Sequence, residues 1–263
     1  MDILKRHIAP LSTEAWNEID DRAKDVLKSV LSARKAVHVK GPMGWDYAAV
    51  PEGRLEVKDK QESDIKVGTH KVKALVEART MFELNKWELD NIQRGAKDIN
   101  LDSLEEATKR LALYEEESIF NGNKDAGIQG LLEAASHSLK FGKSASDIMT
   151  AISEAHFLLR ESYAERPYSL IVGKEAYKRL GGTFEGYPLI QAIKDVIHGE
   201  VIPSLALDGA LLVPHDHEDI ELTIGQDFSI GYDSHTSTSV KFFITESFTF
   251  RTLDENIIVK FKI

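Results

Sequence analysis

The stretch "VKALVEARTMFEL", Val72 to Leu84, alternates between two kinds of side chain. Apolar or small residues occupy every second position from Val72 to Leu84, and charged residues such as Glu77 fill most positions between them. Because successive side chains of a strand point to opposite faces, this alternation predicts a β-strand of about 13 residues. Strands usually have about five or six residues, so we expect this one to project from the body or to run along a neighbouring chain.

The residues before this strand complete a hairpin. Two extended segments, "YAAVPEGRLEV" at 47–57 and "IKVGTHKVKALVEA" at 65–78, flank the polar link "KDKQESD" at 58–64. Apolar residues in extended runs on either side of a polar, charged link are typical of two strands joined by a loop. We predict a long hairpin between Gly41 and Ala78, and an arm of this kind indicates assembly with other chains.

Outside the hairpin, helices precede strands. Apolar residues at three- and four-residue steps predict a helix from Thr13 to Lys35, with Ser12 or Thr13 as its cap. Ser103 and Glu106 have the spacing of a capping box, and Ser144 is a further expected cap. Strand patterns dominate after residue 200, which gives an α+β class. The further helices are predicted at 85–94, 103–120, 145–161, 174–180 and 189–198.

Composition limits the possible partners. The chain has 263 residues and a formal net charge of -10. An acidic protein is poorly suited to neutralising phosphates, so no nucleic acid is expected as a partner. The absence of cysteine excludes disulfides and thiolate metal sites. The longest apolar runs are far shorter than the roughly 20 residues of a membrane helix, and the first residues lack the apolar segment of a secretory signal. We therefore expect a cytoplasmic protein without a membrane partner.

The run "HDHED" at 215–219 is the strongest candidate for metal chemistry. A mononuclear site needs three or four converging ligands, whereas in an extended segment only His215 and His217 would share a face. Apolar segments flank the run, so we interpret it as a polar hairpin turn. A metal-dependent hydrolase using His215 and His217 is the weakest of the alternatives.

Other enzyme signatures are absent from the sequence. No histidine has a Glu three residues before it, as di-iron bundles require, and His-Glu-x-x-His does not occur. The Gly-Lys-Ser of "FGKSAS" lacks the first glycine of a phosphate loop, a position that His137 occupies. Gly-x-Ser-x-Gly does not occur either. We predict no catalytic residue and no metal ligand.

Several segments together resemble the encapsulin family, the shell proteins of bacterial and archaeal nanocompartments, formerly known as linocin-type bacteriocins. The resemblance covers essentially the whole chain, and its markers follow the family's order. These markers are "LKRHIAPLSTEAWNEID", "GPMGWDYAA", "FELNKWELDNIQRG", "EEESIFNG", "PYSLIV", "GYPL", "GQDFSIGY" and "FFITESFTF".

The resemblance implies the Hong Kong 97-type fold of phage major capsid proteins. Residues 1–40 would then form an N-terminal helix region, and residues 41–75 an E-loop that reaches over a neighbouring subunit. Residues 76–130 and 220–263 would form the P-domain, and residues 131–219 the A-domain at the fivefold axis. The fold also agrees with the hairpin, because an arm too long to bury in its own subunit is satisfied by another chain.

The function that the resemblance implies is a family 1 encapsulin shell, an icosahedral homo-oligomer in the smallest arrangement. The shell would enclose a cargo enzyme, a ferritin-like iron oxidase or a dye-decolourising peroxidase, for iron storage or oxidative-stress defence. The chain itself would then be no enzyme. The alternative is a viral or prophage major capsid protein that packages DNA, which the fold does not exclude.

By resemblance, a C-terminal targeting peptide of the cargo docks between the N-terminal helix and P-domain strands. An apolar stripe with one cation suits a short peptide that brings aliphatic side chains and a carboxylate or carbonyl group. Packing within the chain's own domain is an equal expectation for Leu27 and Leu31. The candidate docking residues are Val26, Leu27, Val30, Leu31, Arg34, Val37 and Ile230.

Two further sites are expected. The loop Gly181, Gly182, Thr183, Phe184, Glu185 and Gly186 is the candidate fivefold pore, in which copies of Glu185 would favour cations. Trp87 and Tyr187 resemble an aromatic pair that is associated with flavin in some family members. No cofactor is required, and packing is the simpler role for Trp87.

Overall fold

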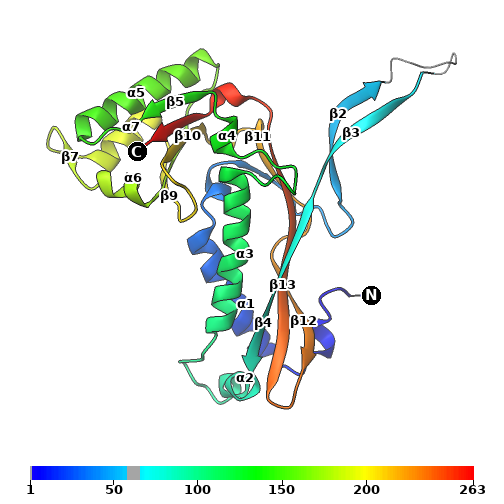
Figure 1. The fold of residues 1–263 in the computed structure, drawn as a ribbon. Coiled ribbons are helices and arrows are strands. Elements are labelled where there is room, and N and C mark those ends of the chain that lie inside the picture. The colour runs from blue at the N-terminus through cyan, green and yellow to red at the C-terminus, as the bar shows by residue number, and fades with distance from the viewer. Residues whose placement is uncertain (1, 58–65) are drawn as a thin grey trace.

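The computed structural model describes residues 2–57 and 66–263. The chain forms an elongated lobe, a second lobe at one end of it, and a two-stranded arm that projects from their junction (Figure 1). The polar link predicted at 58–64 lies outside the described residues. Among the described helices, none is long and apolar enough to cross a membrane.

The elongated lobe is built on the longest strand, β13 (Ser239–Thr252). One edge of β13 pairs antiparallel with β4 (Val76–Asn85), and its other edge pairs with β12 and β11 in turn. The sheet order is β1-β11-β13-β12, with β4 beside β13. The remaining strands of this sheet are β1 (His38–Lys40), β11 (Ile220–Ile224) and β12 (Ser229–His235).

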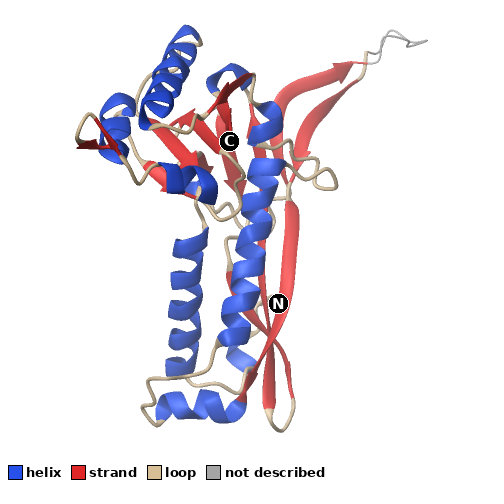
Figure 2. Ribbon diagram, turned by 60° about the vertical axis from the view of Figure 1, so that its left-hand side comes forward, coloured by secondary structure: helices blue, strands red, loops and turns tan. Residues whose placement is uncertain are grey.

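Three helices belong to the elongated lobe. α1 (Thr13–Val30) and α3 (Asp102–Asn121) run side by side along it, and α2 (Lys86–Gln93) crosses its far end (Figure 2). At that end Phe82 stacks on Phe242 with ring centroids 5.1 Å apart, and Trp16 meets Phe242 edge to face. Aromatic pairs of this kind add to the stabilisation from apolar burial, so they fix α1 on the sheet.

The second lobe has its own five-stranded sheet, of order β5-β14-β10-β6-β9. Its central strand β10 is buried along its whole length, as is β6 beside it, which explains their continuous apolar sequences. The core of this lobe continues into the elongated lobe through Phe248 and Phe250 of β13. The sheet strands are β5 (His137–Lys140), β6 (Tyr168–Val172), β9 (Val201–Pro203), β10 (Ala210–Pro214) and β14 (Val259–Lys262).

Short elements complete the chain. The second lobe carries four helices and the two-residue strands β7 and β8, which form a hairpin of their own. The described residues also form three short 3-10 helices, of which η3 packs against α5 of this lobe and the other two lie outside it. The bounds are α4 (Leu131–Ala134), α5 (Ala145–Glu161), α6 (Lys174–Arg179), α7 (Leu189–Ile197), β7 (Thr183–Phe184), β8 (Tyr187–Pro188), η1 (Arg6–Ile8), η2 (Ala33–Lys35) and η3 (Glu255–Ile257).

The arm consists of β2 (Ala49–Val57) and β3 (Gly68–Ala74), paired antiparallel. The predicted alternation is confirmed in β4, where Phe82 and Leu84 are buried and their neighbours are exposed. The predicted strand is not continuous, however. It breaks at Leu75, whose N–H donates to the carbonyl of Ala48, and there its partner changes from β2 to β13.

Two local predictions about helix ends need correction. α1 ends at Val30 rather than at Lys35, because Ser32 Oγ and the Ala33 N–H both donate to Glu116 and draw the backbone out of the helix. Ser103 caps no helix, since its hydroxyl donates to the Glu83 carbonyl. The caps predicted at Ser12 and Ser144 are confirmed.

Two corrections concern the path of the chain. The run 215–219 is not a hairpin turn, since β10 before it and β11 after it belong to different sheets. The last strand, β14, pairs with β10 and β5 of the second lobe, although the range 220–263 was assigned to the P-domain. Alternating Val259 and Phe261 predict a strand, but its partners depend on contacts distant in sequence.

Candidate functional site

A groove of about 590 Å³ separates α1 from strands β12 and β13. The N-terminal segment closes one end of it, where the Leu4 carbonyl accepts from the Tyr232 N–H of β12. Lining side chains come from four separate parts of the chain. They are Leu4, Arg6, Asp20, Ala23, Lys24, Leu27, Lys28, Leu31, Arg34, Lys35, Asp227, Phe228, Ser229, Ile230 and Ile244.

α1 presents one side to the core and the adjacent side to the groove. Ser12 Oγ accepts from the Ala15 N–H at the start of the helix. Ala15, Ile19 and Ala23 are buried, so α1 is anchored along its length. Leu27 is only half-buried and lies on the groove side. This arrangement leaves an aliphatic side chain available for an additional partner.

The groove floor is apolar. Phe228, Ile230 and Ile244 line it from β12, β13 and the segment before β12. Ile230 is only 5% exposed, because it also packs in the core of the elongated lobe. The guanidinium of Arg34 lies over the Phe228 ring, 5.0 Å from its centroid. The floor is therefore a rigid part of the fold.

Arg34 sits at the end of the groove in a cluster of acidic groups. Its Nε and Nη2 donate to Glu115 at 2.8 and 2.5 Å, and its Nη1 donates to Asp227 Oδ1 at 2.9 Å. Glu246 Oε2 lies 3.5 Å away. Burial alone would lower the pKa of Arg34, but these carboxylates raise it. The Arg34 guanidinium is thus already bound by carboxylates of its own chain.

Two further carboxyl groups near this end have raised pKa values. Burial, more than the neighbouring Glu115, holds the pKa of Glu246 well above its usual range. Burial also raises the pKa of Glu116 to about 7, against the opposing effect of its hydrogen bonds from Ser32 and Ala33. Both shifts mean that the interior favours the neutral acid over the carboxylate.

Lysines supply the remaining positive charge of the groove. Arg6 is neutralised by Asp20, whose two carboxylate oxygens both accept from Arg6 Nη2, at 2.8 and 2.7 Å. Lys24, Lys28 and Lys35 also line the groove, and all three are exposed. Their spacing could have indicated them, since Lys24 and Lys28 are one helical turn apart on α1 and lie beside Leu27, whereas Arg34 was the cation predicted for the site.

The predicted docking residues do not all meet. Leu27, Leu31, Arg34 and Ile230 line the groove. Val26 and Val30 line a separate hollow with Glu105 and Leu205, and Val37 is buried in the core of the second lobe. Leu4 and Phe228 are groove residues that the sequence did not single out.

The candidate pore loop is a tight hairpin. Glu185 and Gly186 form its turn with φ values of 51° and 81°. Both values are left-handed, a conformation that favours glycine, which explains the glycine at position 186. Thr183 and Glu185 are exposed, whereas Phe184 packs against the core of the second lobe. Gly181 and Gly182 have no left-handed φ, so their glycine identity is not required by backbone conformation.

The two aromatic residues considered for flavin lie apart. Trp87 is 66% exposed on α2, and Arg94 lies over its ring at 5.5 Å. Tyr187 is 47% exposed in β8. α2 and the β7–β8 hairpin are at opposite ends of the molecule in Figure 1. One chain therefore does not bring the pair together, and a shared flavin would require a second chain.

The histidines of the run 215–219 have protein partners. His215 Nδ1 lies 3.0 Å from Ser169 Oγ, and His217 Nδ1 accepts from the Asp219 N–H at 3.2 Å. Asp216 meets His38 at 2.8 Å. Within the part of the chain that the structure describes, no three His, Asp or Glu side chains are grouped to hold a metal. The run joins the two sheets, and each contact holds that crossing in place.

Relatives with known roles match the chain along nearly its full length. The profile of the family described as "Encapsulating protein for peroxidase" matches residues 1–249. A type 1 encapsulin shell protein of Rhodospirillum rubrum is 37% identical over 262 residues, 96% of this chain and 94% of the relative. One from Mycobacterium tuberculosis is 33% identical over 259 residues, 95% of each chain.

Solved structures support the fold independently. A virus-like particle from Pyrococcus furiosus has a TM-score of 0.71 at 16% identity, over 95% of this chain and 100% of its own. The capsid of Myoviridae phage XM1 has a TM-score of 0.58 at 11% identity, over 88% and 91%. The predicted Hong Kong 97-type α+β fold is thus confirmed.

Proposed function

The chain belongs to the family of encapsulating proteins for peroxidase, and on that premise we propose that it is the shell subunit of an encapsulin nanocompartment. Copies of the chain assemble into a closed icosahedral cage around a cargo enzyme. The chain supplies the container, and the cargo supplies the chemistry. The arm and the groove are the two features that support these two roles.

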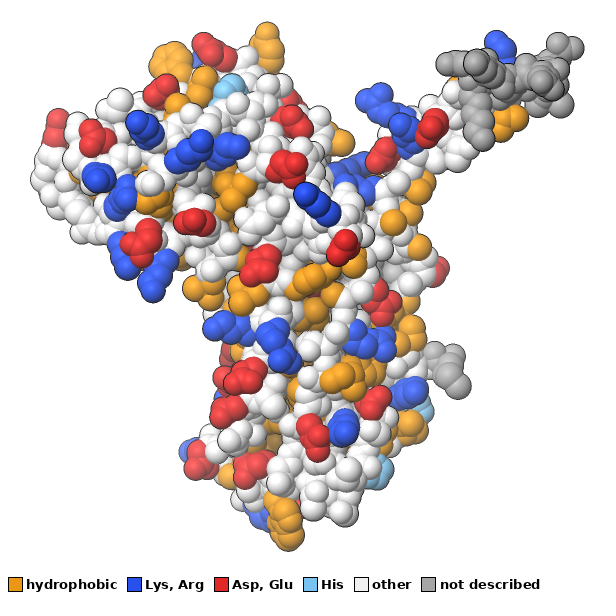
Figure 3. Space-filling view, viewed as in Figure 1, with side chains coloured by type: hydrophobic (Ala, Val, Ile, Leu, Met, Phe, Trp, Pro, Cys, Tyr) orange, Lys and Arg blue, Asp and Glu red, His pale blue; other side chains and the backbone are white. Residues whose placement is uncertain are grey.

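The arm supports assembly. A two-stranded ribbon is at best marginally stable alone in water. This one exposes large apolar side chains, with Leu55, Val57 and Val72 each more than half exposed. Figure 3 shows hydrophobic side chains along its surface. Exposed apolar groups and open strand edges are stabilised by contact with a neighbouring chain, so the isolated subunit is incomplete.

Sedimentation tests assembly directly. The chain has a mass of 29.4 kDa. We expect the purified protein to sediment as one particle many times heavier than the subunit. A monomer or dimer at micromolar concentration would contradict the proposed shell.

The groove supports cargo docking. Its floor accommodates aliphatic side chains, while Lys24, Lys28 and Lys35 provide positive charge at the surface. Arg34 is held by Glu115 and Asp227, so it acts through the shape of the groove rather than as a free cation. The fitting occupant is a short C-terminal peptide of the cargo with aliphatic side chains and an acidic group.

Neighbouring valine and leucine positions offer a matched test of docking. Leu27→Asp places a charge in the groove, whereas Val26→Asp places it in the separate hollow. We expect Leu27→Asp to abolish co-purification of cargo with intact particles, and Val26→Asp to retain cargo. Equal retention in both variants would contradict docking in the groove. Ile230 is less suitable, because a charge there would be buried in the core.

The same comparison applies to the lysines. Replacing Lys24, Lys28 and Lys35 together by Gln should reduce the amount of cargo per particle several-fold. Lys109→Gln, in the separate hollow, should leave it unchanged. An undiminished cargo load in the triple variant would show that the positive charge of the groove has no part in docking.

A DNA-packaging capsid is the second candidate, because the fold is shared with phage capsids. The net charge of -10 opposes it, since a wall that contacts packaged DNA must neutralise phosphates. The absorbance of purified particles separates the two. A spectrum typical of protein supports the enzyme container, and a spectrum dominated by nucleic acid supports the capsid.

A further inference from the structure

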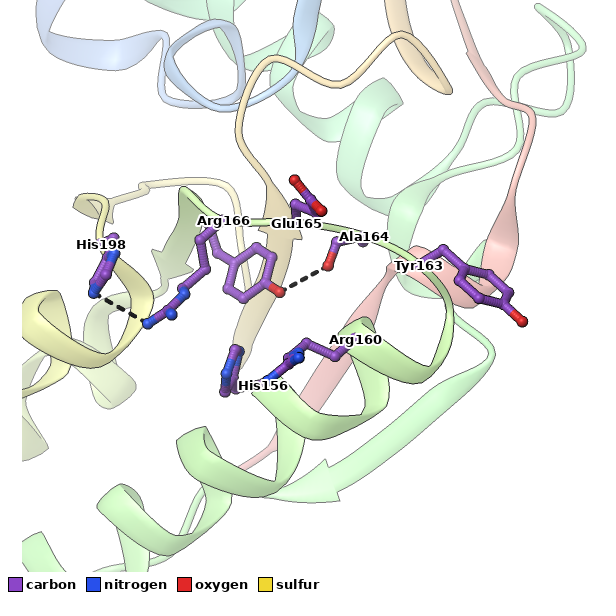
Figure 4. A pocket seen from close by; sticks show the side chains of 8 residues that line it. His156, Arg160, Tyr163, Ala164, Glu165, Arg166 and His198 are labelled. Carbon is purple, nitrogen blue, oxygen red and sulfur yellow. Dashed lines mark hydrogen bonds between the residues drawn. The ribbon is translucent and has the colours of Figure 1, made fainter.

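A second pocket, of about 560 Å³, lies in the second lobe, away from the cargo groove. It is formed where the C-terminal half of α5, the loop that follows it and the end of α7 meet (Figure 4). Neither assembly nor cargo docking, as argued above, makes use of it. Its lining residues are His156, Arg160, Tyr163, Ala164, Glu165, Arg166, Tyr168 and His198.

Four basic side chains gather in this pocket from three segments. His156 and Arg160 are one helical turn apart on α5, so both lie on the same face. Arg166 follows in the loop, and His198 ends α7 in a left-handed conformation with φ 53°. In Figure 4 Arg160 reaches back toward His156, and Arg166 extends toward His198.

No carboxylate of the described chain neutralises these groups. Arg160 has no ion pair or hydrogen bond from its side chain within residues 2–57 and 66–263. Arg166 Nη1 lies 3.1 Å from both the Val196 carbonyl and His198 Nε2, and neither of these groups is a carboxylate. Glu165 also lines the pocket, but Figure 4 shows its carboxylate directed away from the four basic side chains. By contrast, Arg22 is paired with Glu105.

The basic groups act on one another. Burial, followed by the charges of Arg166, Arg160 and His198, lowers the pKa of His156. His156 Nδ1 is buried and has no hydrogen-bond partner among the described residues. A chain with a net charge of -10 therefore contains a local site of unbalanced positive charge with an unused polar atom. An anion in the pocket would relieve the repulsion among these basic groups.

We propose that this pocket binds an oxyanion, with Arg160 and Arg166 as its main ligands and His156 and His198 as additional donors. Guanidinium groups present planar sets of N–H donors that match the oxygens of phosphate and carboxylate. Two sources share this chemistry. One is a free phosphate or phosphate ester, for which the pocket has ample volume, and the other is a carboxylate side chain from a second copy of the chain.

The test uses inorganic phosphate as the probe, titrated calorimetrically into the purified, assembled protein in phosphate-free buffer. The variants are Arg160→Gln, Arg166→Gln and the double variant. Arg160 forms no side-chain hydrogen bond in the described chain, so its loss removes charge without removing a structural contact. Arg110→Gln is the matched control, because Arg110 is an exposed arginine whose side chain, within the described residues, donates to Thr80 alone.

Saturable phosphate binding, weakened about tenfold or more by the double variant and unchanged by Arg110→Gln, would establish the free-anion source. If the particle does not bind phosphate, the same titration on dissociated subunits tests the second source. Binding by subunits alone, with fewer particles formed by the double variant than by Arg110→Gln, would identify a neighbour's carboxylate as the ligand. Absence of phosphate binding in both states, with normal assembly of the double variant, would overturn the proposal.

Discussion

Glu115 and Glu246 are fully buried and share one cation, Arg34, whose Nη2 lies 2.5 Å from Glu115 Oε2 and 3.5 Å from Glu246 Oε2. Asp227 holds the other side of the guanidinium at 2.9 Å and also lines the cargo groove. Removing one partner of a buried ion pair leaves charges without compensation. The end of the groove is therefore a structural joint between α3, β13 and the segment after α1.

The first prediction concerns this joint. Arg34→Met should lower the free energy of unfolding by about 3–5 kcal/mol, because the buried Glu115 carboxylate loses the cation that pairs with it. Denaturant-induced unfolding of the dissociated subunit measures it. The control is Arg22→Met, since the Arg22–Glu105 pair is partly exposed and should contribute less than about 1 kcal/mol. Similar losses in the two variants would mean that Arg34 is not a structural centre.

The second prediction concerns pH. Burial raises the folded-state pKa of Glu116 from 4.5 to about 7, so folding favours its protonated form. The resulting stabilisation is fully present below pH 4.5 and is lost as the pH rises to about 7. As the pH rises across this window, the ionisation of Glu116 lowers the free energy of unfolding by up to about 3 kcal/mol, at 1.36 kcal/mol per pKa unit.

Glu116→Gln should flatten this dependence, because the amide mimics the neutral acid and can still accept from the Ala33 N–H. Unfolding curves recorded from pH 5 to pH 8 measure the slope. Glu175→Gln is the control, because Glu175 is exposed and pairs with Lys178 at the surface. An unchanged slope in Glu116→Gln would exclude Glu116 as its source.

The third prediction concerns the arm. Leu55→Asp with Val57→Asp should leave the subunit folded, because both side chains are largely exposed in the single chain. The same pair should reduce particle formation at least tenfold, since each charge would lie in an apolar contact with a neighbour. Glu56→Gln, between the two positions, should assemble normally. Light scattering at matched subunit concentration would detect the difference, and normal assembly of the double variant would remove the arm from the interface.

The fourth prediction concerns the β7–β8 hairpin. Glu185 is exposed at its turn, so Glu185→Lys reverses the charge with little effect on packing. If copies of this turn line a pore, cargo-filled particles of the variant should take up a divalent cation several-fold more slowly. Glu185→Gln should give an intermediate rate. Equal rates in wild type and both variants would exclude a role for Glu185 in entry.

Local features of the fold were predictable where periodicity decides them. The alternation up to Leu84 predicted both the strand and its buried face, and Ser12 and Ser144 predicted two helix starts. Ser103 has equally good capping spacing, yet the Glu83 carbonyl of β4 takes its hydroxyl. A tertiary contact decided between two hydrogen bonds that the sequence alone makes equivalent.

The sequence does not predict which sheet a strand joins, or which residues meet in a site, as well as it predicts local structure. Val259 and Phe261 indicate a strand, but nothing in their pattern shows that β14 pairs with β10. Arg34 was expected to face the cargo, because the three carboxylates that surround it come from positions up to 212 residues away, at Glu246. The pocket with Arg160 has no sequence motif, since its basic residues come from three segments.

The central claim is that the chain forms a closed container for an enzyme, and electron microscopy of particles purified from the source cells tests it most directly. Mass spectrometry and the ultraviolet absorbance of the same fraction identify the contents. We predict uniform closed shells that contain a second protein and little nucleic acid. A small species without particles, or shells filled with DNA, would contradict the account.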